Sequence, residues 1–265
     1  MTSSSTTPER CRICSSNSTL LFTAKVLRKY QVSYFQCTSC GFIQTERPYW
    51  LKEAYESPIN FSDTGIIRRN LRMARICTSL IFLLFDRKEK MLDYAGGTGL
   101  FTRLMRDIGF DFYWTDPYTL NFLARGFESN PNTRYRVVTS FESFEHFENP
   151  SSELEKILAL GDNVIVTTEL VPNPAPKLEN WWYYAPEHGQ HIAFYTRASF
   201  EVLANQAGVF YLNIDNVHLL LKKRPGLLVR ALLAAPFAKY WLFAVSFILE
   251  LFIRTKIFDD QQKLR

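Results

Sequence analysis

MLDYAGGTG, residues 91–99, is the stretch of sequence that decides the fold. An apolar run with an early acid, Asp93, enters a glycine-rich turn. Apolar residues then recur at helical spacing from Leu100 until Gly109. A strand, a glycine turn and a helix in this order bring a backbone close to a nucleotide-like ligand. We therefore predict a ligand-binding turn between Asp93 and Gly99.

A second short strand, Phe110 to Thr115, follows at once and ends on Asp116. An acid at the tip of the second strand can accept hydrogen bonds from a ribose diol. This acid favours a cofactor site over a tight structural bend. The position of Asp93, two residues before the turn, favours S-adenosylmethionine over a dinucleotide.

The pattern resembles motif I of class I methyltransferases, which bind S-adenosylmethionine. Ala95 departs from that motif, which usually has glycine there, so the turn must tolerate one more methyl group. The resemblance places cofactor contacts on the turn, on Asp116, after the following strand and at the start of the helix near residue 70. The expected cofactor-binding residues are Asp93, Ala95, Gly96, Gly97, Gly99, Asp116, Phe141, Glu142 and Asn70.

Strands and helices continue to alternate after the turn. We expect strands at 135–139 and 163–168, and a helix after Pro150 with Ser152 and Glu155 as a capping box. A helix capped by Thr196 precedes a hairpin of 209–214 and 217–221. This order predicts an α/β fold: a Rossmann-like, mainly parallel sheet with a terminal antiparallel hairpin. Ligands in such sheets lie at the carboxyl ends of the strands.

Two C-x2-C pairs near the N-terminus predict a small structural zinc module. Cys11 and Cys14 are separated from Cys37 and Cys40 by 22 residues that read as a small hairpin. Four thiolates complete a tetrahedral shell with no open position, so the expected Zn²⁺ is structural. Cys77 lies among apolar residues at helical spacing and is expected to be a core thiol.

Two further segments resemble one group of class I methyltransferases common in clusters for sugar and surface-polysaccharide synthesis. They are FESFEHFENP, residues 141–150, and WWYYAPEHGQHIAFY, residues 181–195. The four-cysteine module resembles that of nucleotide-sugar C-methyltransferases, and the likeness covers residues 11 to 215. Those enzymes carry a further large C-terminal domain, and none of the 265 residues resembles it. The resemblance therefore implies a sugar or glycan acceptor and leaves the methylated atom open.

Methyl transfer needs an acceptor in line with the sulfonium methyl, and a base where the acceptor loses a proton. The candidate bases are His191, His188 and His146, whereas His218 in the last strand is expected to be structural. Should histidine not serve, Glu142, Glu145, Glu187 or a tyrosine is the alternative. The expected substrate-facing residues are Tyr55, Asp63, Glu145, Trp182, Tyr183 and Tyr184. Two alternatives stay open: Tyr55, with Tyr49 and Trp50, packs the small domain against the large one, and the loop at 181–195 folds over the sheet end without touching a substrate.

The net charge of +5 is concentrated at the C-terminal end. From Asn216 onward there are nine Lys and Arg against three acids, a net +6, which leaves −1 for the rest. This distribution argues against nucleic acid as a partner, since phosphate binding needs a basic footprint around the site. The apolar, basic tail predicts helices that lie in a membrane interface, form a dimer surface or pack on the body.

The first ten residues are polar, so we expect no secretory signal and a cytoplasmic protein, peripheral at the inner membrane surface if the tail binds lipid. The predicted divisions are a zinc module (1–46), a helical connector or lid (47–87), the methyltransferase domain (88–222) and the helical tail (223–265). Two other functions stay open: an RNA methyltransferase with a zinc module, and a non-catalytic scaffold with a degenerate cofactor site.

Overall fold

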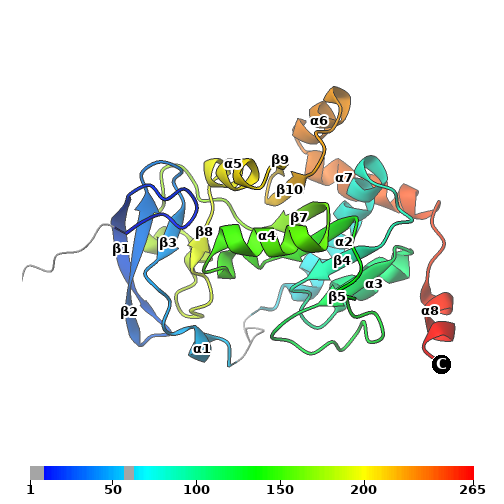
Figure 1. Cartoon of the computed structure of the whole chain (residues 1–265), viewed down its shortest axis with the longest axis horizontal. Coiled ribbons are helices and arrows are strands. Elements are labelled where there is room, and N and C mark those ends of the chain that lie inside the picture. Colours follow the sequence, from blue (N-terminus) through cyan, green and yellow to red (C-terminus); the bar gives the residue numbers. More distant parts are fainter. Residues whose placement is uncertain (1–8, 57–62) are drawn as a thin grey trace, which may run out of the picture.

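The structure of the chain, a computed structural model, describes residues 9–56 and 63–265 (Figure 1). Its centre is a six-stranded sheet in the order β5-β4-β6-β7-β10-β9. The first four strands in this order are parallel to one another, and β10 is antiparallel to both β7 and β9. The strands are β4 (Met91–Tyr94), β5 (Phe112–Thr115), β6 (Val137–Phe141), β7 (Asn163–Thr167), β9 (Phe210–Ile214) and β10 (Val217–Leu221). The predicted parallel sheet with a terminal hairpin is confirmed.

Helices cover both faces of this sheet because its strands are apolar on both sides. Met91, Val137 and Ile165 pack beneath α2 (Ile66–Leu84) and α3 (Leu100–Ile108). The neighbouring residues Leu92, Val138 and Val164 face the opposite side, toward α4 (Pro150–Leu160) and α5 (Arg197–Gln206). Successive side chains of a strand alternate between faces, so each strand contributes to both cores.

The N-caps of these helices agree in part with those predicted from the sequence. Thr196 caps α5, and its hydroxyl accepts from the Ser199 backbone N–H at 3.0 Å. The capping box expected at Ser152 and Glu155 is wrong. Asn149 is the N-cap of α4 and accepts from the Ser152 N–H, because Pro150 takes the first helical position.

A second, four-stranded antiparallel sheet has the order β1-β2-β3-β8. The predicted hairpin forms β1 (Ser18–Val26) and β2 (Tyr30–Cys37), and β3 is Ile43–Thr45. Its fourth strand, β8 (Ala193–Phe194), is distant in sequence from the other three, since it follows β7. The loop that follows β7 therefore belongs structurally to the N-terminal module as well as to the central sheet, as Figure 1 shows.

Short helices occupy the connections between the two sheets. The helix α1 (Leu51–Ala54) follows β3, and the 3-10 turn η1 (Phe144–His146) follows β6. Two further 3-10 turns, η2 (Leu178–Asn180) and η3 (Trp182–Tyr184), lie in the loop after β7. The predicted connector, 47–87, is described only in part, since residues 57–62 lie outside the described residues.

The C-terminal segment forms α6 (Leu227–Ala234), α7 (Ala238–Glu250) and α8 (Ile257–Lys263). The helix α7 packs along α2, where the Ser79 hydroxyl donates to the Leu242 carbonyl at 2.5 Å. Within the described residues, no single helix is long and apolar enough to cross a membrane. The pair α6 and α7 passes by length and composition, but it is bent by 109°.

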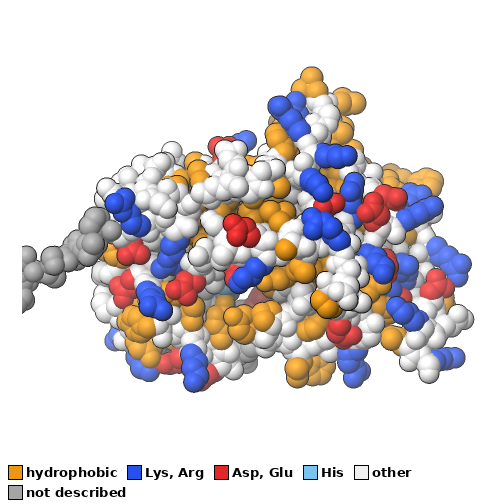
Figure 2. Space-filling model, viewed as in Figure 1, with side chains coloured by type: hydrophobic (Ala, Val, Ile, Leu, Met, Phe, Trp, Pro, Cys, Tyr) orange, Lys and Arg blue, Asp and Glu red, His pale blue; other side chains and the backbone are white. Residues whose placement is uncertain are grey.

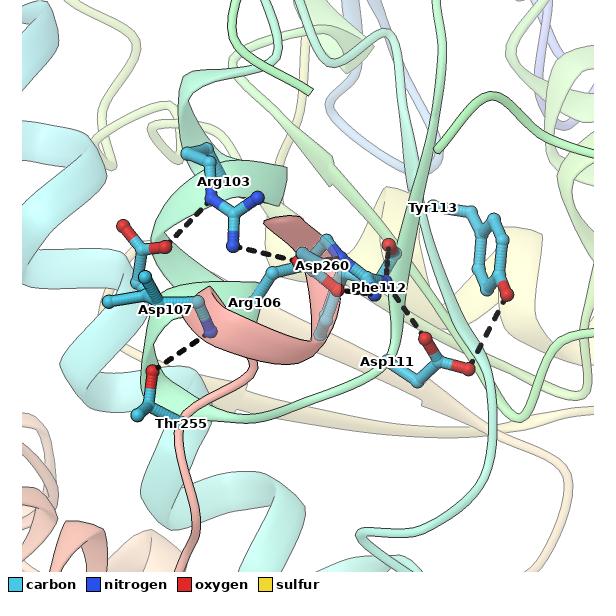
Figure 3. Close-up of polar contacts among 9 residues, drawn as sticks. Arg103, Arg106, Asp107, Asp111, Phe112, Tyr113, Thr255 and Asp260 are labelled. Carbon is cyan, nitrogen blue, oxygen red and sulfur yellow. Dashed lines mark hydrogen bonds and ion pairs between the residues drawn. The ribbon is translucent and has the colours of Figure 1, made fainter. Parts of the chain in front are cut away.

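Buried ion pairs hold α8 against α3 (Figure 3). Asp260 of α8 accepts from Arg106 at 2.6 and 2.8 Å and from Arg103 at 2.9 Å. Arg106 also donates to Asp111 and to the Phe112 carbonyl, each at 2.8 Å. The last helix is therefore fastened to the body by charged hydrogen bonds, which are the stronger kind.

Candidate active site

The glycine turn between β4 and α3 is built from left-handed backbone. Ala95 has φ +57°, Gly97 φ +54° and Gly99 φ +84°. A Cβ on Gly96 would lie 2.6 Å from the Asp93 carboxylate, so only glycine fits there. Among the described residues, apart from Gly97 itself and its two chain neighbours, no heavy atom lies within 4 Å of the position that a Cβ on Gly97 would take. The backbone at Gly97 is thus bare toward open space, the arrangement that lets a ligand approach it closely.

Asp93 supports this turn from beneath. Its side chain is buried and accepts from the hydroxyls of Thr139 at 2.9 Å and Thr102 at 3.2 Å. Burial raises the pKa of Asp93 to about 7, although these hydrogen bonds oppose the shift. Neither threonine could be predicted from the sequence, since neither lies next to Asp93 in the chain.

Asp116 lies at the tip of β5 and faces the same turn. Its carboxylate accepts from the backbone N–H groups of Gly97 at 2.9 Å and of Tyr118 and Thr119 at 2.8 Å. The acid therefore joins the glycine turn to the loop that follows β5. Trp114 adds a second link, because its indole N–H donates to the Gly97 carbonyl at 2.9 Å.

Two glutamates follow β6 at the same edge of the sheet. Glu142 has φ +49°, and its Oε1 accepts from the Thr167 hydroxyl at 2.7 Å. Glu145 is completely buried, and neither of its carboxylate oxygens has a hydrogen-bond partner among the residues the structure describes. Burial raises the pKa of each to about 7, and the charge of Glu145 adds to the shift at Glu142.

Two of the three candidate histidines meet at this point. The rings of His146 and His191 lie 5.1 Å apart and nearly perpendicular. Burial lowers the pKa of His146 to about 3 and also lowers the pKa of His191, so both imidazoles are neutral at pH 7. His188 lies apart from the pair, with its Nε2 3.4 Å from the Glu187 carboxylate.

Tyr55 connects these histidines with the cofactor end of the site. Its hydroxyl lies 3.0 Å from Nδ1 of His146, and its ring stacks on that of Tyr118 at 5.0 Å between centroids. Tyr118 in turn donates its backbone N–H to Asp116. Contacts thus run from the glycine turn to the histidines, with a residue of the connector in the middle.

The sequence matches the methyltransferase domain family over residues 67–212, a little over half of the chain. The chain belongs to this family. The matched segment contains the glycine turn, Asp116, both glutamates and all three candidate histidines of the methyltransferase. Among curated proteins, no sequence matches it.

Solved structures similar to the methyltransferase include two with bound S-adenosylhomocysteine. The magnesium protoporphyrin IX methyltransferase of Synechocystis PCC 6803 is 10% identical, with a TM-score of 0.39, and the match covers 65% of this chain and 94% of that one. The plantazolicin methyltransferase BpumL is 17% identical, with a TM-score of 0.46, covering 73% of this chain and 84% of that one.

The aromatic loop of the methyltransferase is mostly buried. Trp182 is 76% exposed, whereas Tyr183 and Tyr184 are buried in a cluster with Tyr34 of β2 and Phe194 of β8. Both tyrosines are buried in the core of the four-stranded sheet, and Tyr183 also lies against His191, with ring centroids 4.7 Å apart. Their expected role toward the substrate stays a prediction. Trp182 is the member of this group that presents an exposed ring.

The remaining predicted contacts are placed as follows. The Asn70 amide donates to the Ile66 carbonyl of its own helix at 2.8 Å, and Asp63 forms a bidentate pair with Arg69 at 2.6 and 2.8 Å. Phe141 packs edge-on against Phe101 of α3, with ring centroids 4.7 Å apart. Their roles toward cofactor and substrate stay predictions.

The four cysteines of the N-terminal module converge as predicted. Their sulfurs all lie within 4.8 Å of one another, with Sγ–Sγ distances of 3.3 Å for Cys14–Cys37, 3.6 Å for Cys14–Cys40 and 3.7 Å for Cys11–Cys40. A zinc ion with four Zn–S bonds of about 2.3 Å needs sulfurs roughly 3.8 Å apart. The donor set therefore fits a four-thiolate zinc ion. Cys77 is a buried core thiol, as expected.

Proposed function

We propose that the chain transfers a methyl group from S-adenosylmethionine to a hydroxyl-bearing acceptor, a sugar or glycan precursor. The observation that carries the proposal is the turn at Gly97, whose bare backbone lies next to the Asp116 carboxylate. When bound, the cofactor supplies an electrophilic methyl group on a sulfonium. Asp116 is placed to accept from a ribose hydroxyl, because a carboxylate has about four lone pairs and three N–H bonds leave about one of them free.

Exposed apolar side chains follow Asp116 and give the adenine a surface to pack on. Tyr118, Leu120 and Phe122 are 67%, 76% and 67% exposed. Apolar rings that remain exposed beside a polar turn are typical of a ligand site. Asp93 acts through the turn, since its carboxylate is already engaged by two threonine hydroxyls.

The acceptor is proposed to lie near His146 and His191. Both imidazoles are neutral at pH 7 and can accept a proton, but a pKa of about 3 makes His146 a weak base, so His191 is the preferred candidate for removing the hydroxyl proton of the acceptor. Exposed Trp182 offers a flat face of the kind that packs on sugar rings. His188, further from the pair, is expected to affect turnover less than His191.

The two other functions differ from this one in the ligands that the protein would bind. An RNA methyltransferase would need a basic surface at the site, yet outside the C-terminal 50 residues the net charge is −1. A scaffold with a degenerate site would bind no cofactor. The zinc ion is proposed as a structural partner in each case, held by the four thiolates.

Calorimetry with S-adenosylmethionine tests the proposal directly. Asp116→Ala should weaken binding about tenfold or more, since a hydrogen bond to a charged group contributes roughly 1.5–3 kcal/mol. Glu128→Ala, which removes an exposed acid from the same loop, is the matched control. Wild-type protein without affinity for the cofactor would leave the scaffold function. Methylation of RNA in preference to nucleotide sugars would replace the proposed acceptor.

A further inference from the structure

Three metal-binding side chains meet at the carboxyl edge of the central sheet. Glu145 and His146 belong to η1, and His191 comes from the loop before β8; one donor atom of each lies within 4.8 Å of the other two. The Ile192 N–H donates to the Glu145 carbonyl at 2.9 Å, so the backbone itself fastens the two segments together. The cluster is separate from the four cysteines.

The Glu145 carboxylate is the strongest indication that something else binds here. The residue has no exposed surface, and neither oxygen has a hydrogen-bond partner among the described residues. The hydroxyls of Thr168 and Tyr183 face the carboxylate, but they lie 3.0 Å from each other and form their hydrogen bond together. A buried carboxylate without a partner is costly, and native structures rarely leave one. The guanidinium of Arg69 does not satisfy it, because that group is engaged by Asp63.

His191 is held as metal-binding histidines are. Its Nδ1 lies 2.7 Å from the Tyr183 carbonyl, which can only accept, so Nδ1 carries the hydrogen. The lone pair is then on Nε2. A histidine that ligates a metal through one nitrogen usually donates from the other to a carbonyl or carboxylate.

We propose that Glu145, His146 and His191 bind a divalent transition-metal ion beside the cofactor turn. Two imidazoles and a carboxylate suit Zn²⁺, Mn²⁺ or Fe²⁺ and leave coordination positions open. Glu142 is close enough for its charge to repel that of Glu145, and it is a candidate fourth ligand through the oxygen that Thr167 does not bind.

The open coordination positions of the ion indicate which class of acceptor can bind. This inference rests on the proposed methyl transfer. A hydroxyl oxygen bound to a divalent ion loses its proton far more readily than a free one. An acceptor with two neighbouring oxygens, such as a vicinal diol, could occupy two positions at once. In that case the histidines hold the ion instead of acting as bases, and the ion lowers the pKa of the acceptor hydroxyl. The proton passes to solvent water, the oxygen forms its bond to the methyl carbon, and the bond from that carbon to the sulfonium breaks to leave the thioether.

Cobalt substitution tests the site without any activity assay. Co²⁺ held by four thiolates absorbs strongly through thiolate-to-cobalt charge transfer, whereas Co²⁺ held by imidazole and carboxylate does not. The full-length protein should bind one equivalent of Co²⁺ that lacks this absorption, in addition to the thiolate-bound one. Glu145→Gln and His191→Ala should each weaken that equivalent at least about tenfold. His188→Ala, three residues from His191, is the matched control and should retain it.

The possible results test the metal site and the proposed methyl transfer independently. Only thiolate-bound Co²⁺ in the wild type, or unchanged Co²⁺ affinity in both Glu145→Gln and His191→Ala, would overturn the metal site. Circular dichroism of the same samples reports whether each variant is folded, and a variant that fails to fold is set aside in favour of the other. Co²⁺ binding in a wild type that does not bind S-adenosylmethionine would keep the metal site and reject the methyl transfer.

Discussion

Asp93 combines complete burial with an ionisable group, and this makes the stability of the protein depend on pH. Its pKa is about 7 in the folded chain, against 3.8 for an unperturbed Asp. Between about pH 4 and 7, therefore, Asp93 keeps a proton in the folded state that it has already released in the unfolded state. The contribution of Asp93 to the free energy of unfolding is present below pH 4 and is lost as the pH rises through 7.

We predict that Asp93→Asn removes this dependence. The variant should gain on the order of 2–3 kcal/mol relative to the wild type between pH 4.5 and pH 8, because the amide cannot ionise. Urea unfolding of both proteins at the two pH values, without cofactor, measures the difference. Asp107→Asn, on the partly exposed outer side of α3, serves as control. Parallel pH profiles of Asp93→Asn and wild type would contradict the prediction.

At the same scale, Ala95 shows how far single residues could be predicted. The sequence indicated a turn that must tolerate an alanine, and the structure places this residue at φ +57°. The identity of Asp93 and Asp116 as the acids of the turn also followed from their places at strand ends. Thr102, Thr139 and Thr167, which hold the carboxylates, could not be predicted, since a hydroxyl contact across strands leaves no periodic pattern in the sequence.

Among the elements, α8 depends on one buried acid. Asp260 is 4% exposed and accepts three hydrogen bonds from Arg103 and Arg106. Asp260→Ala should lower the free energy of unfolding by about 3 kcal/mol, because it leaves the buried Arg106 without its main partner. Chemical denaturation measures the loss, and hydrogen exchange should show α8 opening first. Asp259→Ala, which removes the exposed neighbouring acid, should change the free energy of unfolding little. An equal decrease in this variant would show that the ion pairs of Asp260 do not hold α8.

The four-cysteine element should hold zinc. We expect about one thiolate-bound zinc per chain, lost in Cys37→Ser together with protection of β1 and β2, since metal binding and folding are coupled in such modules. Metal analysis with hydrogen exchange checks both parts. Cys77→Ala removes a thiol outside the cluster and should keep the zinc. Freshly reduced wild-type protein without zinc would reject the module.

For the whole molecule, the sequence predicted individual helices, strands and turns better than the contacts between elements that are distant in sequence. The glycine turn, the hairpin of β1 and β2 and the hairpin of β9 and β10 each carry a pattern within a few residues. The pairing of β8 with β3 carries none, because a strand of two residues has no period to read. The contact of Ile192 with the Glu145 carbonyl, which places His191 beside that glutamate, carries no pattern either, so the convergence of the histidine–carboxylate cluster is seen only in three dimensions.

The tail shows the same division between local pattern and assembly. Its helices were predicted, and α7 packs on α2, so the body covers part of the apolar surface. A large part stays exposed: Leu227 and Leu228 are each 75% exposed, and Phe237 is 76% exposed. In Figure 2, hydrophobic side chains around α6 alternate with Lys and Arg at the top of the view. Exposed apolar side chains mixed with basic ones fit an anionic lipid surface better than a second copy of the same charge.

We predict that the tail binds vesicles containing phosphatidylserine more strongly than vesicles of phosphatidylcholine alone. Attraction between the net +6 of the last 50 residues and the lipid should fall as salt rises from about 50 to 500 mM. Leu228→Asp should weaken binding, because it places a charge within the apolar surface. Leu20→Asp makes the same change at a residue of β1 that is 60% exposed, and should leave binding intact. Co-sedimentation measures the partition, and light scattering of lipid-free protein reports self-association. A dimer that Leu228→Asp dissociates, with no vesicle binding in the wild type, would assign this surface to a second copy of the chain instead.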